Sequence, residues 1–211
     1  MKQKEKFGKI AIYQLFPQPV YFSKLERSLT KEEFKTVAKH QKETLKNEGN
    51  IVSKDNYVLE NKTLKNLKKD LNKKIINYFN EVVCTSNSII PYITQSWLNY
   101  TETNQFHHNH CHANSYVSGV FYISANKEFD RIKFYKTGYQ PIQLQVSKYN
   151  IFNSDSWWYA VQTGDVVLFP SSLRHGVDSK KGTNSRISLS FNVFFKGTLG
   201  TKEELTELIF K

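Results

Sequence analysis

The stretch that decides the fold class is Gly164-Asp165-Val166-Val167-Leu168-Phe169-Pro170-Ser171-Ser172-Leu173-Arg174-His175. A Gly-Asp turn opens an apolar run rich in β-branched and aromatic residues, which predicts a buried strand that ends just before His175. Similar short runs recur from Ile89 onward, separated by Gly, Asn and Pro rather than by a helical pattern. They predict strands at Ile89–Tyr100, Gln105–His112, Tyr116–Ser124, Arg131–Lys136, Ile142–Val146, Trp157–Gln162, Val166–Pro170 and Arg186–Phe195.

Short strands in this number, with no helices between them, predict a mainly β fold: a sandwich, jelly roll or barrel. Flanking helices are expected. A capping box at residues 30–33 starts one helix that should run to about Lys46 and stop at Gly49, and a leucine-rich stripe predicts a second from about Thr63 to Val82. A further capping box at residues 201–204 predicts a C-terminal helix through Phe210, and Ile10–Phe22 reads as an edge strand or extended arm.

The chain of 211 residues is expected to form a single domain. We divide it into an N-terminal arm with supporting helices (residues 1–88), a β core (residues 89–197) and the C-terminal helix (residues 198–211). The two cysteines, Cys84 and Cys111, lie far apart in the chain, which favours free thiols in a reducing compartment. No secretion signal or long apolar segment is evident, so we expect a soluble, cytoplasmic protein without a membrane partner.

The formal net charge of +11 is concentrated in the N-terminal half. Residues 1–90 contain 18 Lys and Arg against 10 Asp and Glu, a net charge of 18 − 10 = +8, which leaves +3 for the remainder. Most of these lysines lie opposite apolar positions at helical spacing, as expected of a solvated helix face. Nucleic acid is an alternative partner that this distribution does not favour.

Four of the six histidines lie in the seven-residue stretch Phe106-His107-His108-Asn109-His110-Cys111-His112. Imidazole is the commonest protein ligand of transition metals, so the stretch predicts part of a metal site; a His-rich polar loop is the alternative. On a strand, alternate side chains share a face, so His108, His110 and His112 should project together and His107 should point to the other side. Two of the three can reach one ion, and His175 is the distant third ligand.

Arg186-Ile187-Ser188 follows His175 by eleven residues. On a strand, Arg186 and Ser188 share a face, and a guanidinium with a hydroxyl suits a carboxylate. The alternative is that Arg186 pairs with a carboxylate of the chain itself.

These segments together resemble the iron(II)- and 2-oxoglutarate-dependent dioxygenases, most closely a bacterial and phage branch with a His-x-His motif. The matching residues are Ser96–Asn99, His110–Ser115, Ser118–Ile123, Phe169–His175 and Arg186–Asn192, so the resemblance covers about Ser96 to Gly197. It implies a double-stranded β-helix, the jelly roll also found in cupins. It also implies Fe(II), 2-oxoglutarate and O2 as cofactor and co-substrates, in a bacterial or phage-infected cell.

Carried over residue by residue, the resemblance makes His110, His112 and His175 the metal ligands, and Arg186 with Ser188 the 2-oxoglutarate site, with Tyr122 a weaker candidate there. His108 with His110 is an alternative register. This chain departs from the family at His112, where most members have Asp or Glu. Three neutral imidazoles carry no charge, so dianionic 2-oxoglutarate would just balance Fe(II), and iron should bind less tightly without it.

The activity that the resemblance implies is oxidation of an unidentified substrate, with hydroxylation as the default outcome. Two other classes of function remain open. One is a three-histidine enzyme of the cupin type that does not use 2-oxoglutarate. The other is a non-enzymatic jelly roll that binds metal or serves a structural role.

Overall fold

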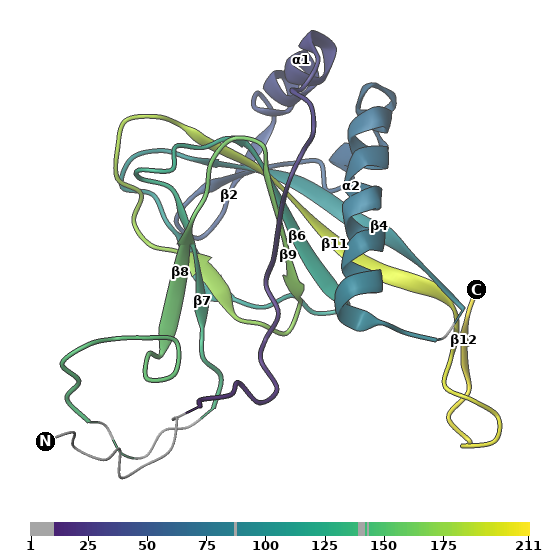
Figure 1. Ribbon diagram of the computed structural model, residues 1–211. Coiled ribbons are helices and arrows are strands. Elements are labelled where there is room, and N and C mark those ends of the chain that lie inside the picture. The colour runs from purple at the N-terminus through teal and green to yellow at the C-terminus, as the bar shows by residue number, and fades with distance from the viewer. Residues whose placement is uncertain (1–10, 87, 139–141, 143) are drawn as a thin grey trace, which may run out of the picture.

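The computed structural model describes residues 11–86, 88–138, 142 and 144–211. Two antiparallel sheets face each other; one helix lies along the outer face of the larger sheet, and a shorter one packs near the end of that sheet (Figure 1). This arrangement confirms the mainly β, jelly-roll-like fold class. No helix in the described ranges is both long and apolar enough to cross a bilayer.

The larger sheet has eight strands in the order β1-β9-β6-β11-β4-β3-β2, with β12 paired to β11. Their bounds are β1 Tyr21–Lys24, β2 Thr44–Lys46, β3 Ile51–Ser53, β4 Ile89–Thr101, β6 Val117–Ser124, β9 Asp165–Pro170, β11 Arg186–Leu199 and β12 Leu208–Phe210. The smaller sheet has the order β5-β10-β7-β8, with β5 His107–His110, β7 Arg131–Tyr135, β8 Ser156–Ala160 and β10 His175–Val177.

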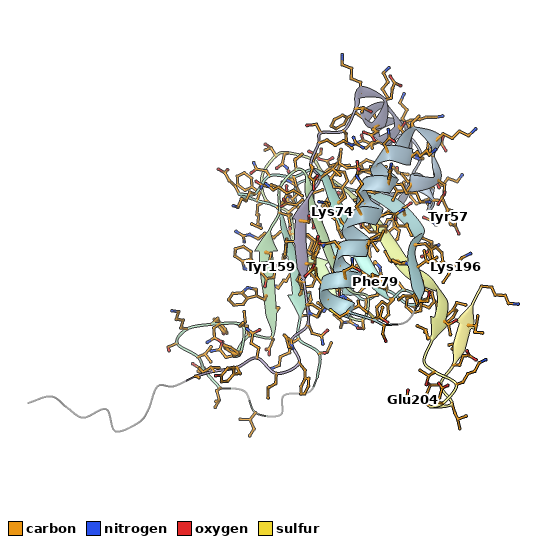
Figure 2. The ribbon with its side chains drawn as sticks, turned by 45° about the vertical axis from the view of Figure 1, so that its right-hand side comes forward. Tyr57, Lys74, Phe79, Tyr159, Lys196 and Glu204 are labelled. Carbon is orange, nitrogen blue, oxygen red and sulfur yellow. The ribbon has the colours of Figure 1, made fainter. Side chains whose placement is uncertain are left out.

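The two helices are α1 (Lys31–His40) and α2 (Lys65–Tyr78). A short 3₁₀ turn, η2 (Lys62–Leu64), leads into α2, and a π-helical turn, η3 (Phe79–Val83), follows it. Another 3₁₀ turn, η1 (Val58–Glu60), lies between β3 and η2. The predicted capping box of α1 forms, because Thr30 and Glu33 cap each other. Helix α2 buries Leu67, Leu71 and Ile75 in the same apolar core as Phe79, which Figure 2 labels at the base of the helix.

Strict alternation along the central strands sets up the site. On β11, Leu189, Phe191 and Val193 join the core beneath the helices. The residues that alternate with them, Ser188, Ser190 and Asn192, therefore face the smaller sheet. The same holds for β6, where Phe121 packs under the helices and Tyr122 joins a second apolar cluster between the two sheets. The inner face of the larger sheet is thus polar where it meets β5 and β10.

Four predicted elements differ in the structure. The first helix ends at His40, and Leu45 lies in strand β2 with Gly49 at the turn of the β2–β3 hairpin, where its φ of +87° suits glycine. Strand β1 starts only at Tyr21; residue 10, where the arm was predicted to begin, lies outside the described residues. Residues 142 and 144–146 form no strand, and the remaining residue of that prediction, 143, is likewise not described.

The predicted C-terminal helix is wrong. The capping bond from the amide of Glu204 to Thr201 Oγ1 forms at 3.2 Å, but Leu205 adopts a φ of +56° and the chain turns back as β12. The ring of Phe210 then packs against Phe194 and Phe195, with centroids 5.3 and 5.8 Å apart. This aromatic contact favours a hairpin over a helix, and its tip, near Glu204 in Figure 2, projects from the body of the molecule.

Candidate metal and co-substrate site

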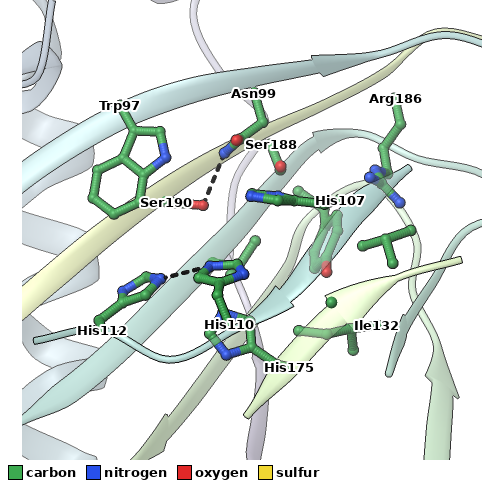
Figure 3. A pocket seen from close by; sticks show the side chains of 14 residues that line it. Trp97, Asn99, His107, His110, His112, Ile132, His175, Arg186, Ser188 and Ser190 are labelled. Atoms are coloured by element: carbon green, nitrogen blue, oxygen red, sulfur yellow. Dashed lines mark hydrogen bonds between the residues drawn. The ribbon is translucent and has the colours of Figure 1, made fainter. Parts of the chain in front are cut away.

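A small cavity lies between the polar inner face of the larger sheet and strands β5 and β10 of the smaller one (Figure 3). Its open volume is about 30 Å³. All six residues of the predicted site line it: His110, His112, His175, Arg186, Ser188 and Tyr122. The other lining side chains with polar groups are Trp97, Asn99, His107 and Ser190.

The ring nitrogens of His110, His112 and His175 lie within 4.8 Å of one another. His110 ends β5 and His175 begins β10, and the two residues are direct partners in the antiparallel ladder. His112 lies in the loop after β5, which its backbone amide anchors by donating to the carbonyl of Ser171 at 3.0 Å. The sheet register therefore brings together histidines that are more than sixty residues apart.

Hydrogen bonds fix the tautomer of all three rings. His110 Nδ1 donates to the carbonyl of His108 at 2.9 Å, and His175 Nδ1 donates to that of Leu173 at 3.0 Å. His112 Nδ1 lies 2.6 Å from Asn192 Oδ1 and 3.0 Å from Ser118 Oγ. A neutral ring that donates through Nδ1 has a lone pair on Nε2. Each ring thus directs an unprotonated nitrogen inward, as metal-binding histidines do.

Burial keeps these rings neutral. Loss of solvent lowers the pKa of His175 to about 3 and that of His110 to about 4, and the neighbouring histidines lower both further. The pKa of His112 is also lowered by burial, although its hydrogen bond to Asn192 opposes the shift. Neutral imidazole is the form that binds metal ions.

The spacing of two of the nitrogens matches a shared ion. His110 Nε2 and His112 Nε2 are 3.0 Å apart, although neither carries a proton to bridge them. Two nitrogens that each lie about 2.1 Å from one metal ion, at right angles to each other, are about 3.0 Å apart. The donor set therefore fits a divalent ion that prefers nitrogen ligands.

Arg186 provides the charge at the other end of the cavity. It is only 3% exposed, and its Nη2 donates to Thr101 Oγ1 at 3.1 Å. Its Nη1 is buried and has no hydrogen-bond partner among the described residues. Burial lowers the pKa of the guanidinium, and Tyr122 and Asp130 oppose that shift. The alternative of an ion pair with an internal carboxylate is not seen in the described part of the chain.

Two asparagines that we did not assign from the sequence also belong to the site. Asn192 orients His112, and Asn99 donates through Nδ2 to Ser190 Oγ at 2.9 Å. The Asn99 Oδ1 acceptor is buried without a partner within the described residues. Asn192 lies on the same face of β11 as Arg186 and Ser188, and Asn99 on β4 is the direct partner of Ser188. The alternation of side chains along these two strands could therefore have identified both asparagines from the sequence.

His107 contradicts our expectation that it points away from the other histidines. Its ring stacks on that of His110, with centroids 4.6 Å apart. The cause is a bulge in β5: His107 pairs with Val177 and His110 with His175, so two residues of β5 lie opposite Gly176 alone. The extra residue reverses the alternation and turns His107 into the cavity.

His108 and His110, the alternative register, lie in a second cluster, but with His107 in place of His175: one ring nitrogen of each of these three residues lies within 4.8 Å of the others. This set lacks comparable support. His108 Nδ1 has no hydrogen-bond partner in the described ranges, and His107 Nε2 has only a contact of 3.4 Å with Asn47 Nδ2. Orientation of the rings by surrounding groups is what distinguishes the two sets.

The sequence and the structure were compared with known proteins. Residues 95–192 match the family described as "Putative 2OG-Fe(II) oxygenase". No curated protein matches the sequence. A 2OG-Fe(II) oxygenase family oxidoreductase from Burkholderia pseudomallei has a similar structure, with 16% identity, a TM-score of 0.54, and coverage of 82% of this chain and 83% of that one.

Two further solved structures share the fold. HygX from Streptomyces hygroscopicus, solved with nickel, 2-oxoglutarate and hygromycin B, has 12% identity, a TM-score of 0.53 and 82% coverage of both chains. The α-ketoglutarate-dependent epimerase SnoN of nogalamycin biosynthesis has 11% identity and a TM-score of 0.58, covering 84% of this chain and 76% of that one. The resemblance read from the sequence is thereby confirmed: residues 95–192 match the model of the putative 2OG-Fe(II) oxygenase family, and the fold is shared with solved 2-oxoglutarate-dependent oxygenases.

Proposed function

We propose that this protein is a non-haem Fe(II)- and 2-oxoglutarate-dependent oxygenase that hydroxylates a substrate not yet identified. In this proposal His110, His112 and His175 hold the metal, and Arg186, with Ser188 and Tyr122, holds the far carboxylate of 2-oxoglutarate. The observation that carries it is the guanidinium nitrogen Nη1 of Arg186, which has no partner among the residues that the structure describes and is buried in the same cavity as three inward-facing imidazole nitrogens.

A buried guanidinium is expensive unless an anion compensates it. Within the described part of the chain, the side-chain hydrogen bond of Arg186 is to a neutral hydroxyl, that of Thr101. Ser188 lies two residues along the same strand face and adds a hydroxyl at the cavity wall. A carboxylate is the ligand that a planar guanidinium and a hydroxyl recognise together. The pair therefore supports a co-substrate that carries a carboxylate away from the metal.

The chain's own residues contribute binding and orientation. Asn192 and Ser118 hold the ring of His112, and the carbonyls of His108 and Leu173 hold those of His110 and His175. Iron and 2-oxoglutarate, when bound, supply the oxidising chemistry with O2. The enclosing sheets exclude bulk water from the cavity, where Arg186 and His175 are both buried.

The proposal is tested by anaerobic addition of Fe(II) and 2-oxoglutarate, which should produce a metal-to-ligand charge-transfer absorption band. His112→Ala and His175→Ala should each abolish the band and weaken metal binding. His40→Ala is the matched control, because His40 ends α1 and does not line the cavity. No band in the parent protein, together with unchanged metal affinity in His175→Ala, would refute the assignment.

His108→Ala separates the two registers in the same experiment. With His112 as a ligand, His108→Ala retains metal affinity and the band. Loss of metal binding in His108→Ala, with retention in His112→Ala, would instead assign the ion to His107, His108 and His110.

A further inference from the structure

The space between the three metal-facing rings and Arg186 is filled by the side chain of His107. Figure 3 shows its ring between His110 and the end of the cavity where Arg186 and Ser188 lie. The ring stacks on that of His110, with centroids 4.6 Å apart, and Arg186 lines the same cavity. The open volume that remains is about 30 Å³.

That volume is too small for the proposed co-substrate. A cavity needs at least roughly 10–15 Å³ of water-accessible space to hold one water molecule, so this one has room for only a few atoms of a ligand. A dicarboxylate with a five-carbon chain is several times larger. Some side chain must therefore leave before 2-oxoglutarate can reach from the metal position to Arg186.

His107 is the lining residue best able to leave. His110, His112 and His175 are held by hydrogen bonds of 2.6 to 3.0 Å, whereas among the described residues the single polar contact of the His107 ring is the 3.4 Å one with Asn47. His107 also borders a second, outer hollow of about 390 Å³, which opens toward solvent beside Asn47 and Gln95. Its ring thus has room to rotate into.

The backbone of β5 and β10 holds the His107 side chain inside the cavity. A side chain at Gly176 would come within 2.9 Å of the His107 carbonyl and 3.0 Å of the His108 carbonyl, so glycine permits the close approach of the bulge. The bulge alone directs His107 inward, because regular alternation would have directed it away. The occupied cavity is therefore a specific feature of this strand.

We propose that His107 is a gate: its ring closes the co-substrate cavity in the resting protein and rotates into the outer hollow when a dicarboxylate enters. This inference rests on the proposed function, since it concerns the same cavity. Opening costs the ring its stacking contact with His110, so 2-oxoglutarate binds the wild-type protein more weakly than it would bind an open cavity.

The test uses protein loaded with Zn(II), which is redox-inert, and measures 2-oxoglutarate binding by calorimetry. His107→Ala should bind it about tenfold more tightly than wild type, because the cost of opening is removed. His107→Phe keeps a ring in the cavity and should bind it no more tightly than wild type. His108→Ala, which changes the adjacent ring outside the cavity, should match wild type. Equal or weaker binding by His107→Ala would overturn the gate.

A second measurement separates the gate from the proposed function. Free imidazole, followed by ligand-observed NMR with metal-free protein, should enter the space left in His107→Ala and should not bind in wild type or His107→Phe. If it does so while 2-oxoglutarate binds none of the loaded proteins, the gate geometry stands and the co-substrate assignment fails. If imidazole fails to enter His107→Ala, the gate is wrong.

The wild-type protein gives an independent readout should a variant not fold. With labelled histidine, the ring protons of His107 carry a ring-current shift from the stacked His110. Addition of 2-oxoglutarate to the zinc-loaded protein should remove that shift. Binding of 2-oxoglutarate with the shift unchanged would overturn the gate.

Discussion

Arg186→Met should make the protein more stable while abolishing 2-oxoglutarate binding. Methionine is unbranched and flexible, and it fills a comparable volume without a charge. Arg186 is 97% shielded from solvent, and within the described residues its guanidinium has no carboxylate partner in contact. The carboxyl group of Asp130 is instead bound by Asn184 at 3.0 Å and lies 4.0 Å from Lys180.

The magnitude follows from two opposing terms. Removing a buried charge relieves a desolvation penalty of several kcal/mol. Against this, the hydrogen bond to Thr101 is lost and its buried hydroxyl loses a partner, at a cost of about 1–3 kcal/mol. The net expectation is a gain of about 2 kcal/mol, which for a chain of this length raises Tm by roughly 4–8 °C.

Denaturant unfolding of metal-free wild-type protein and Arg186→Met measures the stability difference, and calorimetry with zinc-loaded protein measures 2-oxoglutarate binding. Arg186→Lys is the informative companion, because it keeps the charge but not the planar pair of donors, and it should lose most of the binding without the gain in stability. A methionine variant that is at least 1 kcal/mol less stable and still binds 2-oxoglutarate would show that Arg186 is structural. A three-histidine enzyme that does not use 2-oxoglutarate would then be the better assignment.

Further predictions concern the scaffold. Arg27→Ala should destabilise the protein by about 2–4 kcal/mol in denaturant unfolding, because it leaves the Glu33 carboxylate, 2% exposed, without its bidentate partner, whereas loss of the exposed Lys35–Glu32 pair in Lys35→Ala should cost less than about 0.5 kcal/mol. Burial raises the pKa of Glu33, but hydrogen bonds from Arg27 and Thr30 outweigh this effect, and the net pKa lies below 4.5. The unfolded state therefore binds more protons as the pH falls, so the stability from this pair should be complete above about pH 5 and lost on acidification. A pH series of denaturant unfolding should show a smaller loss in Arg27→Ala. Gly119→Ala should lower the free energy of unfolding by roughly 2–3 kcal/mol, because a Cβ there would overlap the ring of Phe191. Thermal unfolding measures this loss. Gly138→Ala is the control: a Cβ there meets no neighbour but φ is +114°, so its loss of stability reports backbone strain alone.

The features that could be predicted from the sequence depend on local periodicity. Strands β4, β6, β7, β8, β9 and β11 all overlap their predicted ranges, because each is a run of β-branched and aromatic residues between turn residues. The shared face of Arg186 and Ser188 follows from the same alternation, which Leu189 and Phe191 confirm by packing on the opposite side. Their roles at a metal and co-substrate site stay predictions.

The elements that the sequence did not predict are determined by pairing between strands that are distant in the sequence or by contacts with them. Leu45 fits a helical stripe, yet the chain places it in the β2–β3 hairpin, 52% exposed, because β3 completes the sheet beside β4. The capping box before Glu204 forms its bond and still starts no helix, since β11 offers an edge for β12. The bulge in β5 is visible only once β10 is its partner, and it alone brings His107 into the cavity.

The charge of the site links metal and co-substrate more closely than a carboxylate-containing ligand set would. Three neutral rings and one guanidinium give the empty cavity a charge of about +1, and a divalent ion would raise it to about +3 in a setting where buried charges are poorly screened. The carboxylate of Asp130 attracts Arg186 electrostatically, but it accepts a hydrogen bond from Asn184 and forms an ion pair with Lys180. The dianion 2-oxoglutarate would neutralise most of this positive charge, so the metal should bind more tightly when 2-oxoglutarate is present. Because binding linkage is reciprocal, 2-oxoglutarate should also bind more tightly when the metal is present. His112→Asp supplies one negative charge permanently and should therefore strengthen metal binding without co-substrate and weaken this coupling, which metal titrations with and without 2-oxoglutarate measure. Equal coupling in the two proteins would mean that the neutral ligand set is not its source.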